Sequence, residues 1–169
     1  MKHALTRWAR HLWVDADDAR RTLTDEGLRR LAECVQASEA RHLGELRLCV
    51  EGGLPITELW RGTGSRERAI ELFSELQVWD TEHNNGVLIY LLLADHRIEI
   101  LADRGLHKLV PHDTWETIAQ SLSSALHAGQ FEAGLTQAIH EVGVLLRQHF
   151  PSCDAHPNPN ELPDAVVLR

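Results

Sequence analysis

The chain has 169 residues, and its 25 acidic residues outnumber its 17 basic ones, which gives a formal charge of −8. This length is enough for one domain with its own core, and 43% apolar with 25% charged residues is typical of folded, water-exposed proteins. The acidic balance excludes the basic surface of a nucleic-acid binder. The longest apolar stretch, residues 86–94, is far shorter than the roughly 20 residues of a membrane helix.

The cysteine pattern and the N-terminus both predict a cytoplasmic protein. Cys34, Cys49 and Cys153 are widely spaced and odd in number, so they form neither a disulfide framework nor a Cys-x-x-Cys site. Residues 1–13 interleave Arg and His with apolar residues and have no continuous apolar core like that of a signal peptide.

Residues 1–21 form an amphipathic N-terminal segment. Leu5, Trp8, Ala9 and Leu12 fall on one face of a helix, and basic residues occupy the rest. We expect this segment to pack on its own domain. The alternative is weak contact of residues 1–13 with an anionic membrane surface, or docking on a partner.

Apolar periodicity and turn residues predict seven further elements. Thr24 is the expected N-cap of the first of these helices, and Leu46, Leu48 and Val50 alternate with polar residues as in a strand. The predicted elements are a helix at about residues 25–41, a strand at 46–51, a helix at 65–78, strands at 86–94 and 98–102, and helices at 112–126 and 131–149.

The order α-β-α-β-β-α-α predicts a three-layer α/β/α sandwich with a small mixed sheet, occupying residues 22–150. Residues 86–94 are nearly all apolar, as in a strand covered on both faces. Residues 151–169 hold four of the six prolines, so we expect a tail outside the core. Its apolar residues 166–168 leave open the alternative of a strand added to a partner's sheet.

Two polar loops are expected to meet at one end of this sheet. A hairpin that turns at Asp95 and His96 places Leu88 opposite Asp103, so the loop before the central strand lies beside the loop after the next one. A parallel crossover from the first strand brings Arg41, His42 and Glu45 to the same end. The converging side chains are Asp80, Glu82, His83, Asn84 and Asn85 from one loop, and Asp103, Arg104 and His107 from the other.

The chemistry of this set is that of a cation or anion site. Carboxylate and amide oxygens suit Ca²⁺ or Mg²⁺, and His83 and His107 extend the choice to Zn²⁺ or Mn²⁺. Arg104 is suited to hold a phosphate or a carboxylate. The alternative is that these residues only satisfy the backbone of solvated loops, with Asn85 and Gly86 serving the turn into the strand.

Several motifs together resemble the TPM domain family, over about residues 25–150. The similarity is to its short, soluble bacterial form, which begins with a helix rich in Arg, His and Trp. The matching segments are residues 69–73 (AIELF), 79–80 (WD), 83–90 (HNNGVLIY), 98–100 (IEI), 102–105 (ADRG) and 127–135 (HAGQFEAGL).

The resemblance implies an α/β/α sandwich with a shallow acidic pocket between the Asn-Gly loop and the loop after the hairpin. It implies divalent-cation binding, acid phosphatase activity in one branch, and accessory roles beside a protein partner such as a membrane-anchored member of the family. Asn85 and Gly86 match the family's Asn-Gly motif, and Asp103, Arg104 and Gly105 match its second loop. The chain departs from longer members at residues 20–24 (RRTLT) and at Asn84, where acidic residues are usual.

Two functions follow as hypotheses. The first is a binding or accessory module that acts on a protein or a membrane assembly through the acidic loops. The second is a metal-dependent phosphomonoester hydrolase, in which Arg104 grips the phosphate and His83 or His107 moves protons. Its metal ligands are Asp80, Glu82, Asn84 and Asp103, and Asn85, Gly86 and Gly105 shape the binding loops. No residue pair identifies a nucleophile with its base, which favours the module.

Overall fold

The sheet contains the three strands that the sequence predicts and one more. The computed structural model describes residues 8, 11, 16–153 and 158–169, with strands β1 (Leu46–Glu51), β2 (Val87–Leu92), β3 (Arg97–Ala102) and β4 (Val167–Leu168). Within these residues the strands form one sheet in the order β3-β2-β1-β4. β1 is parallel to β2 and β4, whereas β3 is antiparallel to β2, so the sheet is mixed as predicted.

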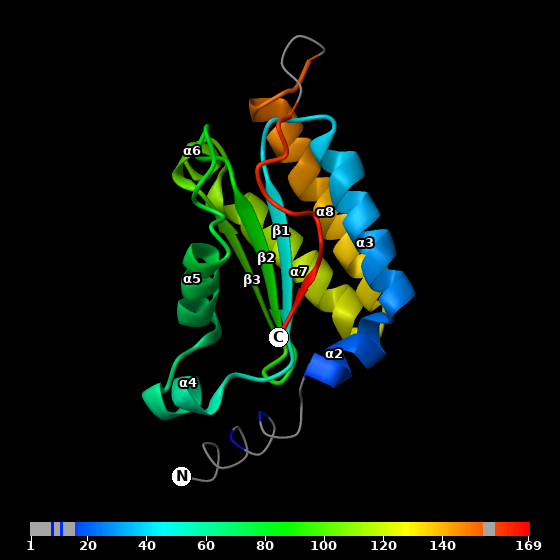
Figure 1. The fold of residues 1–169 in the computed structure, drawn as a ribbon, viewed down its shortest axis with the longest axis vertical. Helices are drawn as coiled ribbons and strands as arrows, with labels where there is room; N and C mark the ends of the chain where they lie inside the picture. The colour runs from blue at the N-terminus through cyan, green and yellow to red at the C-terminus, as the bar shows by residue number, and fades with distance from the viewer. Residues whose placement is uncertain (1–7, 9–10, 12–15, 154–157) are drawn as a thin grey trace.

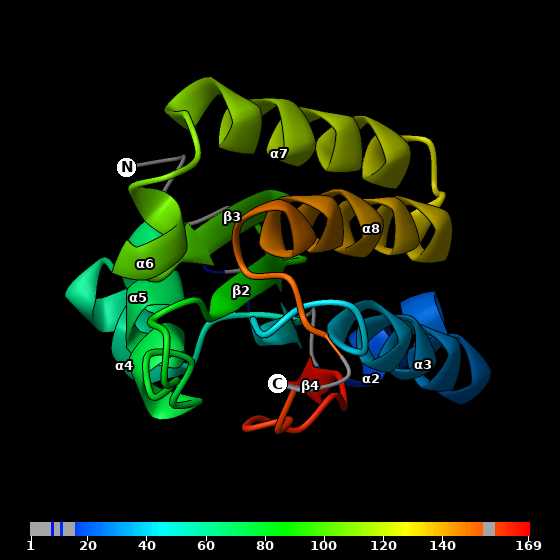
Figure 2. The same ribbon diagram turned by 90° about the horizontal axis from the view of Figure 1, so that it is seen from above.

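Helices cover both faces of the sheet, which confirms the three-layer sandwich. The helices are α2 (Ala16–Leu23), α3 (Asp25–Glu39), α4 (Ile56–Arg61), α5 (Ser65–Glu75), α6 (Arg104–His107), α7 (His112–His127) and α8 (Phe131–His149). Helices α3, α7 and α8, with α2, lie on one face, and α4 and α5 lie on the other (Figure 2). Thr24 caps α3 as expected, because its Oγ1 accepts the N–H of Gly27 at 3.1 Å.

Strand alternation divides the core into two halves. Successive side chains of a strand point to opposite faces. In β2, Val87 and Ile89 pack with the apolar residues of α3, α7 and α8, whereas Leu88 and Tyr90 pack with those of α5. All six residues of β2 are buried. This explains the unbroken apolar run, since a strand covered on both faces needs apolar side chains on each.

The hairpin between β2 and β3 is longer than a two-residue turn. Leu88 pairs with Leu101, not with Asp103 as the tight turn predicted, because residues 93–96 all belong to the connection. His96 has φ 50°, a left-handed conformation that this wider turn requires. The observed register of β3 differs from the predicted one by two residues. Because side chains alternate with a period of two, they still point to the predicted faces.

The C-terminal segment packs on the domain, in contrast to the tail expected outside the core. β4 adds to the free edge of β1, where the Arg169 carbonyl accepts the N–H of Gly52 at 2.8 Å. Leu162 is buried in the core beside α5. Pairing with this edge satisfies backbone groups of β1 that would otherwise face water. The strand therefore extends this chain's own sheet and not that of a partner.

The predicted amphipathic helix over residues 1–13 lies almost wholly outside the described residues. Residues 8 and 11 are described: the Trp8 ring meets Trp60 edge-on at 5.2 Å, and His11 Nδ1 accepts the N–H of Leu54 at 2.9 Å. Among the helices described, none combines the length and the apolar character needed to cross a membrane.

Candidate functional site

The two polar loops lie against each other at the end of the sheet where β2 begins and β3 ends, and the second loop contains the short helix α6 (Figure 1). We call residues 78–86 and 103–109 the loop end. Asp103 N–H donates to the Gly86 carbonyl and Gly105 N–H to the Asn84 carbonyl, both at 2.8 Å. Arg104 Nε also donates to Asn84 Oδ1, at 2.9 Å. These bonds fix the two loops to each other.

Gly105 allows this close approach of the two loops, and Gly86 allows close packing within its own loop. A Cβ on Gly86 would overlap the Val78 carbonyl oxygen, and one on Gly105 would overlap the carbonyl oxygens of His83 and Asn84. The space that a side chain would need is therefore filled by backbone of the same loop at Gly86, and by backbone of the facing loop at Gly105. Gly86 and Gly105, which match the loop motifs of the family, therefore have at least this packing function.

Asn85 and Asp103 hold two acceptor oxygens that lack a donor. Asn85 is fully buried: its Nδ2 donates to the Leu43 carbonyl at 3.0 Å, and its N–H donates to Thr81 Oγ1 at 3.1 Å. Asp103 caps α6, with Oδ1 accepting the N–H of Arg104 at 2.6 Å. Among the described residues, nothing donates to Asn85 Oδ1 or Asp103 Oδ2, although both atoms are buried. Such oxygens suit a hard cation or a water.

The other predicted site residues point outward. Asp80, Glu82, His83, Arg104 and His107 are exposed. The His83 ring stacks on Phe150 with 6.5 Å between ring centroids. No three His, Cys, Asp or Glu side chains of the described residues are grouped to hold a metal, so a cation here would rely on amide oxygens, backbone oxygens and water as well.

The C-terminal segment reaches the loop end as a third element, which sequence reasoning missed. The Glu161 carboxylate accepts the N–H of Glu82 at 3.2 and 3.3 Å. Buried Glu45 in turn accepts the N–H groups of Glu161 and Leu162, both at 3.1 Å. Burial raises the pKa of Glu45. No local pattern could reveal this contact, because its partners are more than 75 residues apart in the sequence.

His42, which the predicted topology placed at this end of the sheet, is a buried residue of the α3–β1 connection. Its Nε2 lies 3.0 Å from Ser38 Oγ and its Nδ1 lies 3.0 Å from the Gly44 carbonyl oxygen. Burial lowers the pKa of His42 to about 4, so the ring is neutral near pH 7. It therefore holds the chain path into β1 and is not presented at the surface.

Glu39, at the end of α3, carries the most perturbed carboxyl near the edge of β1. Its Oε1 accepts the N–H of Leu46 at 2.7 Å, whereas its Oε2 is buried without a donor among the described residues. The pKa of Glu39 is raised to about 9, chiefly by burial, and the neighbouring carboxyls of Glu45 and Asp164 contribute to this rise. A buried carboxyl that keeps its proton can donate it, so Glu39 is suited to share a proton with Asp164.

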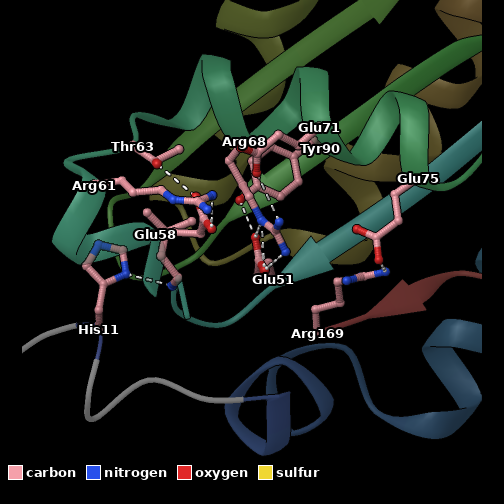
Figure 3. A network of polar contacts seen from close by, with 11 residues as sticks. His11, Glu51, Glu58, Arg61, Thr63, Arg68, Glu71, Glu75, Tyr90 and Arg169 are labelled. Atoms are coloured by element: carbon pink, nitrogen blue, oxygen red, sulfur yellow. Dashed lines mark hydrogen bonds and ion pairs between the residues drawn. The ribbon is translucent and has the colours of Figure 1, made fainter. Parts of the chain in front are cut away.

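A second polar cluster lies between the sheet and α5, remote from the loop end. Glu51 of β1 accepts Nη2 of Arg68 at 2.8 Å and the Tyr90 hydroxyl at 2.6 Å, and all three residues are buried (Figure 3). Glu71 adds an ion pair to Arg68 at 3.3 Å. We call Glu51, Arg68 and Tyr90 the buried network. The alternation over residues 46–51 predicted a strand with one polar face in water, so it carried no sign that Glu51 is buried.

Comparison with solved structures finds a close likeness in shape. The chain is similar to the NMR structure of the BA42 protein from the psychrophilic bacterium Bizionia argentinensis, with 28% sequence identity and a TM-score of 0.74. The match covers 86% of this chain and 94% of that one. The comparison with curated proteins returned no match.

The family comparison agrees with the fold. The model of the TPM domain matches residues 16–145, which include α2 to α7 and most of α8. This stretch contains both loops of the loop end and the whole hairpin. The chain belongs to the TPM domain family.

Proposed function

We propose that this protein is a binding module whose loop end docks on a protein partner. The observation that carries the proposal is the exposed surface of that end: Trp79 and Leu109 are 51% and 50% exposed, although both are large and apolar. Asp80 and Glu82, which follow Trp79 on the same loop, are exposed acidic side chains. A partner that offers basic side chains around an apolar contact fits this surface.

The loop end is suited to docking because its backbone is already ordered. Hydrogen bonds join both loops, and Glu161 fastens Glu82 to the C-terminal segment. A rigid surface loses little conformational entropy on binding, so more of the contact energy remains as affinity. A membrane-anchored protein of the same family is one partner to test.

An affinity capture with the full-length chain tests this proposal. We expect a partner from the native cell that wild-type protein retains and Trp79→Ala loses, with Leu109→Ala weakening capture less. Val144→Ala is the matched control, since Val144 is also an exposed apolar residue, at 41%, but lies on α8. A partner retained equally by all four proteins would place the docking surface elsewhere, and no reproducible partner would contradict the proposal.

The second candidate, a cation-dependent phosphomonoester hydrolase, is favoured by the two acceptor oxygens without donors, Asn85 Oδ1 and Asp103 Oδ2. The matching family model also carries the word phosphatase in its name. Asp103 and Asn85 would hold Ca²⁺ or Mg²⁺, with Asp80, Glu82 and Asn84 nearby on the same loop. The cation would neutralise phosphate charge, Arg104 would bind the phosphate, and His83 or His107 would carry protons.

Aryl phosphate turnover with Ca²⁺, Mg²⁺, Mn²⁺ or Zn²⁺ separates the two candidates. Asp103→Asn is the sharpest variant, because the amide still accepts a hydrogen bond at the start of α6 but removes the charge that a cation needs. Asp113→Asn, an exposed residue in the first turn of α7, is the control. The hydrolase requires turnover that Asp103→Asn abolishes and Asp113→Asn preserves. Equal turnover in all three proteins, or none with any of the four metals, eliminates it.

A further inference from the structure

An apolar cavity of about 260 Å³ lies at the opposite end of the sheet from the loop end. It is bounded by the β2–β3 hairpin, the end of α7, the start of α8 and Thr22 of α2. Figure 1 shows the hairpin and α2 at the lower end of the sheet, with the turn between α7 and α8 beside that end, whereas α6 lies at the upper end. The carboxyl ends of the parallel strands β1 and β2 point to this lower end. That is the end of an open α/β sheet where ligands usually bind.

The cavity has an apolar interior and a basic mouth. Leu91, Leu93, Ile98, Leu126 and Phe131 supply the apolar lining. His96, Arg97 and His127 also line it, and all three are exposed. The two imidazole rings are stacked, with centroids 6.4 Å apart and planes 22° from parallel.

The two acidic residues closest to Arg97 in the sequence, Asp95 and Glu99, do not form an ion pair with it. The Asp95 carboxylate lies 3.1 Å from His11 Nε2, and Glu99 accepts a hydrogen bond from Ser65 Oγ at 2.6 Å on the other face. Within the part of the chain that the structure describes, the Arg97 guanidinium has no carboxylate partner. A ligand anion would supply one.

We propose that this cavity binds a small amphipathic carboxylate, whose short acyl or aryl tail fills the apolar interior while its carboxylate meets Arg97 and the two histidines. An apolar tail fits because ligand pockets are lined mainly by apolar side chains that bury most of the ligand surface. A carboxylate fits because a guanidinium binds it through directed, charge-assisted hydrogen bonds. The volume lies just below the range of roughly 300 to 1,000 Å³ usual for ligand sites, so the ligand is small.

Calorimetric titration of the full-length chain with sodium octanoate tests this site. We expect saturable binding of one octanoate per chain, with 1-octanol, which has the tail without the charge, binding about five-fold more weakly. Acetate, which has the charge without the tail, should not bind measurably. Arg97→Gln should weaken octanoate about five-fold, the upper range for an exposed charge pair. Arg147→Gln, an exposed arginine on α8, is the matched control and should bind as wild type does.

Two further variants test the location of the tail. Ser123→Phe and Leu126→Trp both enlarge side chains that line the cavity from α7, and each should abolish octanoate binding. Circular dichroism and thermal unfolding identify which of them keeps the fold. Octanoate should also shift the NMR methyl signals of Ile98 and Leu126 and leave that of Leu109 at the loop end unchanged, so the result is independent of partner docking.

Three outcomes would overturn the proposal. The first is the absence of saturable octanoate binding to wild-type protein. The second is equal affinity for octanoate and octanol, which would leave no part for the carboxylate. The third is undiminished binding by a folded cavity-filled variant, which would place the ligand elsewhere.

Discussion

The loop end and the buried network both contain several charged residues, but the two regions differ in how completely their polar side chains are hydrogen bonded. In the buried network, Glu51 accepts hydrogen bonds from Arg68 and from the Tyr90 hydroxyl, and all three side chains are shielded from water. At the loop end, Asp103 and Asn85 each keep a buried oxygen without a donor among the described residues.

Polar groups that are fully hydrogen bonded within the protein maintain the fold, whereas acceptor oxygens without a donor can bind a ligand. A buried ion pair with complete hydrogen bonds adds little by itself, but removing one member leaves an unpaired charge in the core. An acceptor without a donor can gain a cation, a water or a partner's donor. The buried network should therefore respond to mutation through stability, and the loop end through binding.

The largest effect is expected for Arg68→Ala, which leaves the Glu51 carboxylate buried and unpaired. The free energy of unfolding should fall by about 3 to 5 kcal/mol, measured by urea denaturation. Arg66→Ala, two residues earlier in α5 but exposed, should change the free energy of unfolding by less than about 1 kcal/mol. Similar losses for the two variants would remove the contrast between buried and exposed charge.

A smaller but still large loss is expected for Gly86→Ala at the loop end. The added Cβ would overlap the Val78 carbonyl oxygen, which is backbone and cannot rotate away. We expect a loss of about 3 kcal/mol. Gly27→Ala is the control, because its Cβ would meet the movable Glu132 carboxylate at 3.1 Å and it lies within α3. If both variants unfold at the same urea concentration, the close loop contact does not contribute to stability.

Glu39→Gln tests the carboxyl whose pKa burial raises. The folded-state pKa of Glu39, about 9, lies above its ordinary value of 4.5, so the folded state binds the proton more tightly. Stability of the wild type should therefore fall as pH rises between these two values, because the unfolded chain releases the proton first. The amide needs no proton and can donate to Asp164, so Glu39→Gln should be more stable by about 1 to 2 kcal/mol at pH 8.

The measurement for this variant is thermal unfolding from pH 5 to pH 9. The advantage of Glu39→Gln over the wild type should grow with pH and be smallest near pH 5. Glu33→Gln on the exposed side of α3 should show no such trend. A constant difference between wild type and Glu39→Gln across this range would contradict a raised pKa as the cause.

The smallest effect on stability is expected for Asp103→Asn. The amide keeps the hydrogen bond to the N–H of Arg104, so the free energy of unfolding should change by less than about 0.5 kcal/mol. Added Ca²⁺ or Mg²⁺ should stabilise the wild type and not this variant, if a cation binds the loop end. A large loss of stability without metal would show that Asp103 is a structural residue, like Glu51.

Much of the fold follows from local patterns. The apolar run of β2 and the Thr24 cap each reflect a requirement of the element that contains them. The alternation in β1 predicted a strand with one polar face in water, whereas all six of its residues are buried. The short helices α2, α4 and α6 were not predicted, since four to eight residues give too little periodicity to detect. The convergence of the polar loops followed from topology alone, because a hairpin and a parallel crossover leave few arrangements.

The sequence by itself determined the family, the sandwich and the two loops, because these depend on local hydrophobic patterns and on short motifs. Only the tertiary structure decided which polar groups find partners. It brought Glu51 to Arg68 and Tyr90, fastened Glu161 against Glu82, and left Asn85 and Asp103 with oxygens that accept nothing from the described residues. Such pairings join residues far apart in the chain, and their free energies depend on burial, which no local pattern specifies.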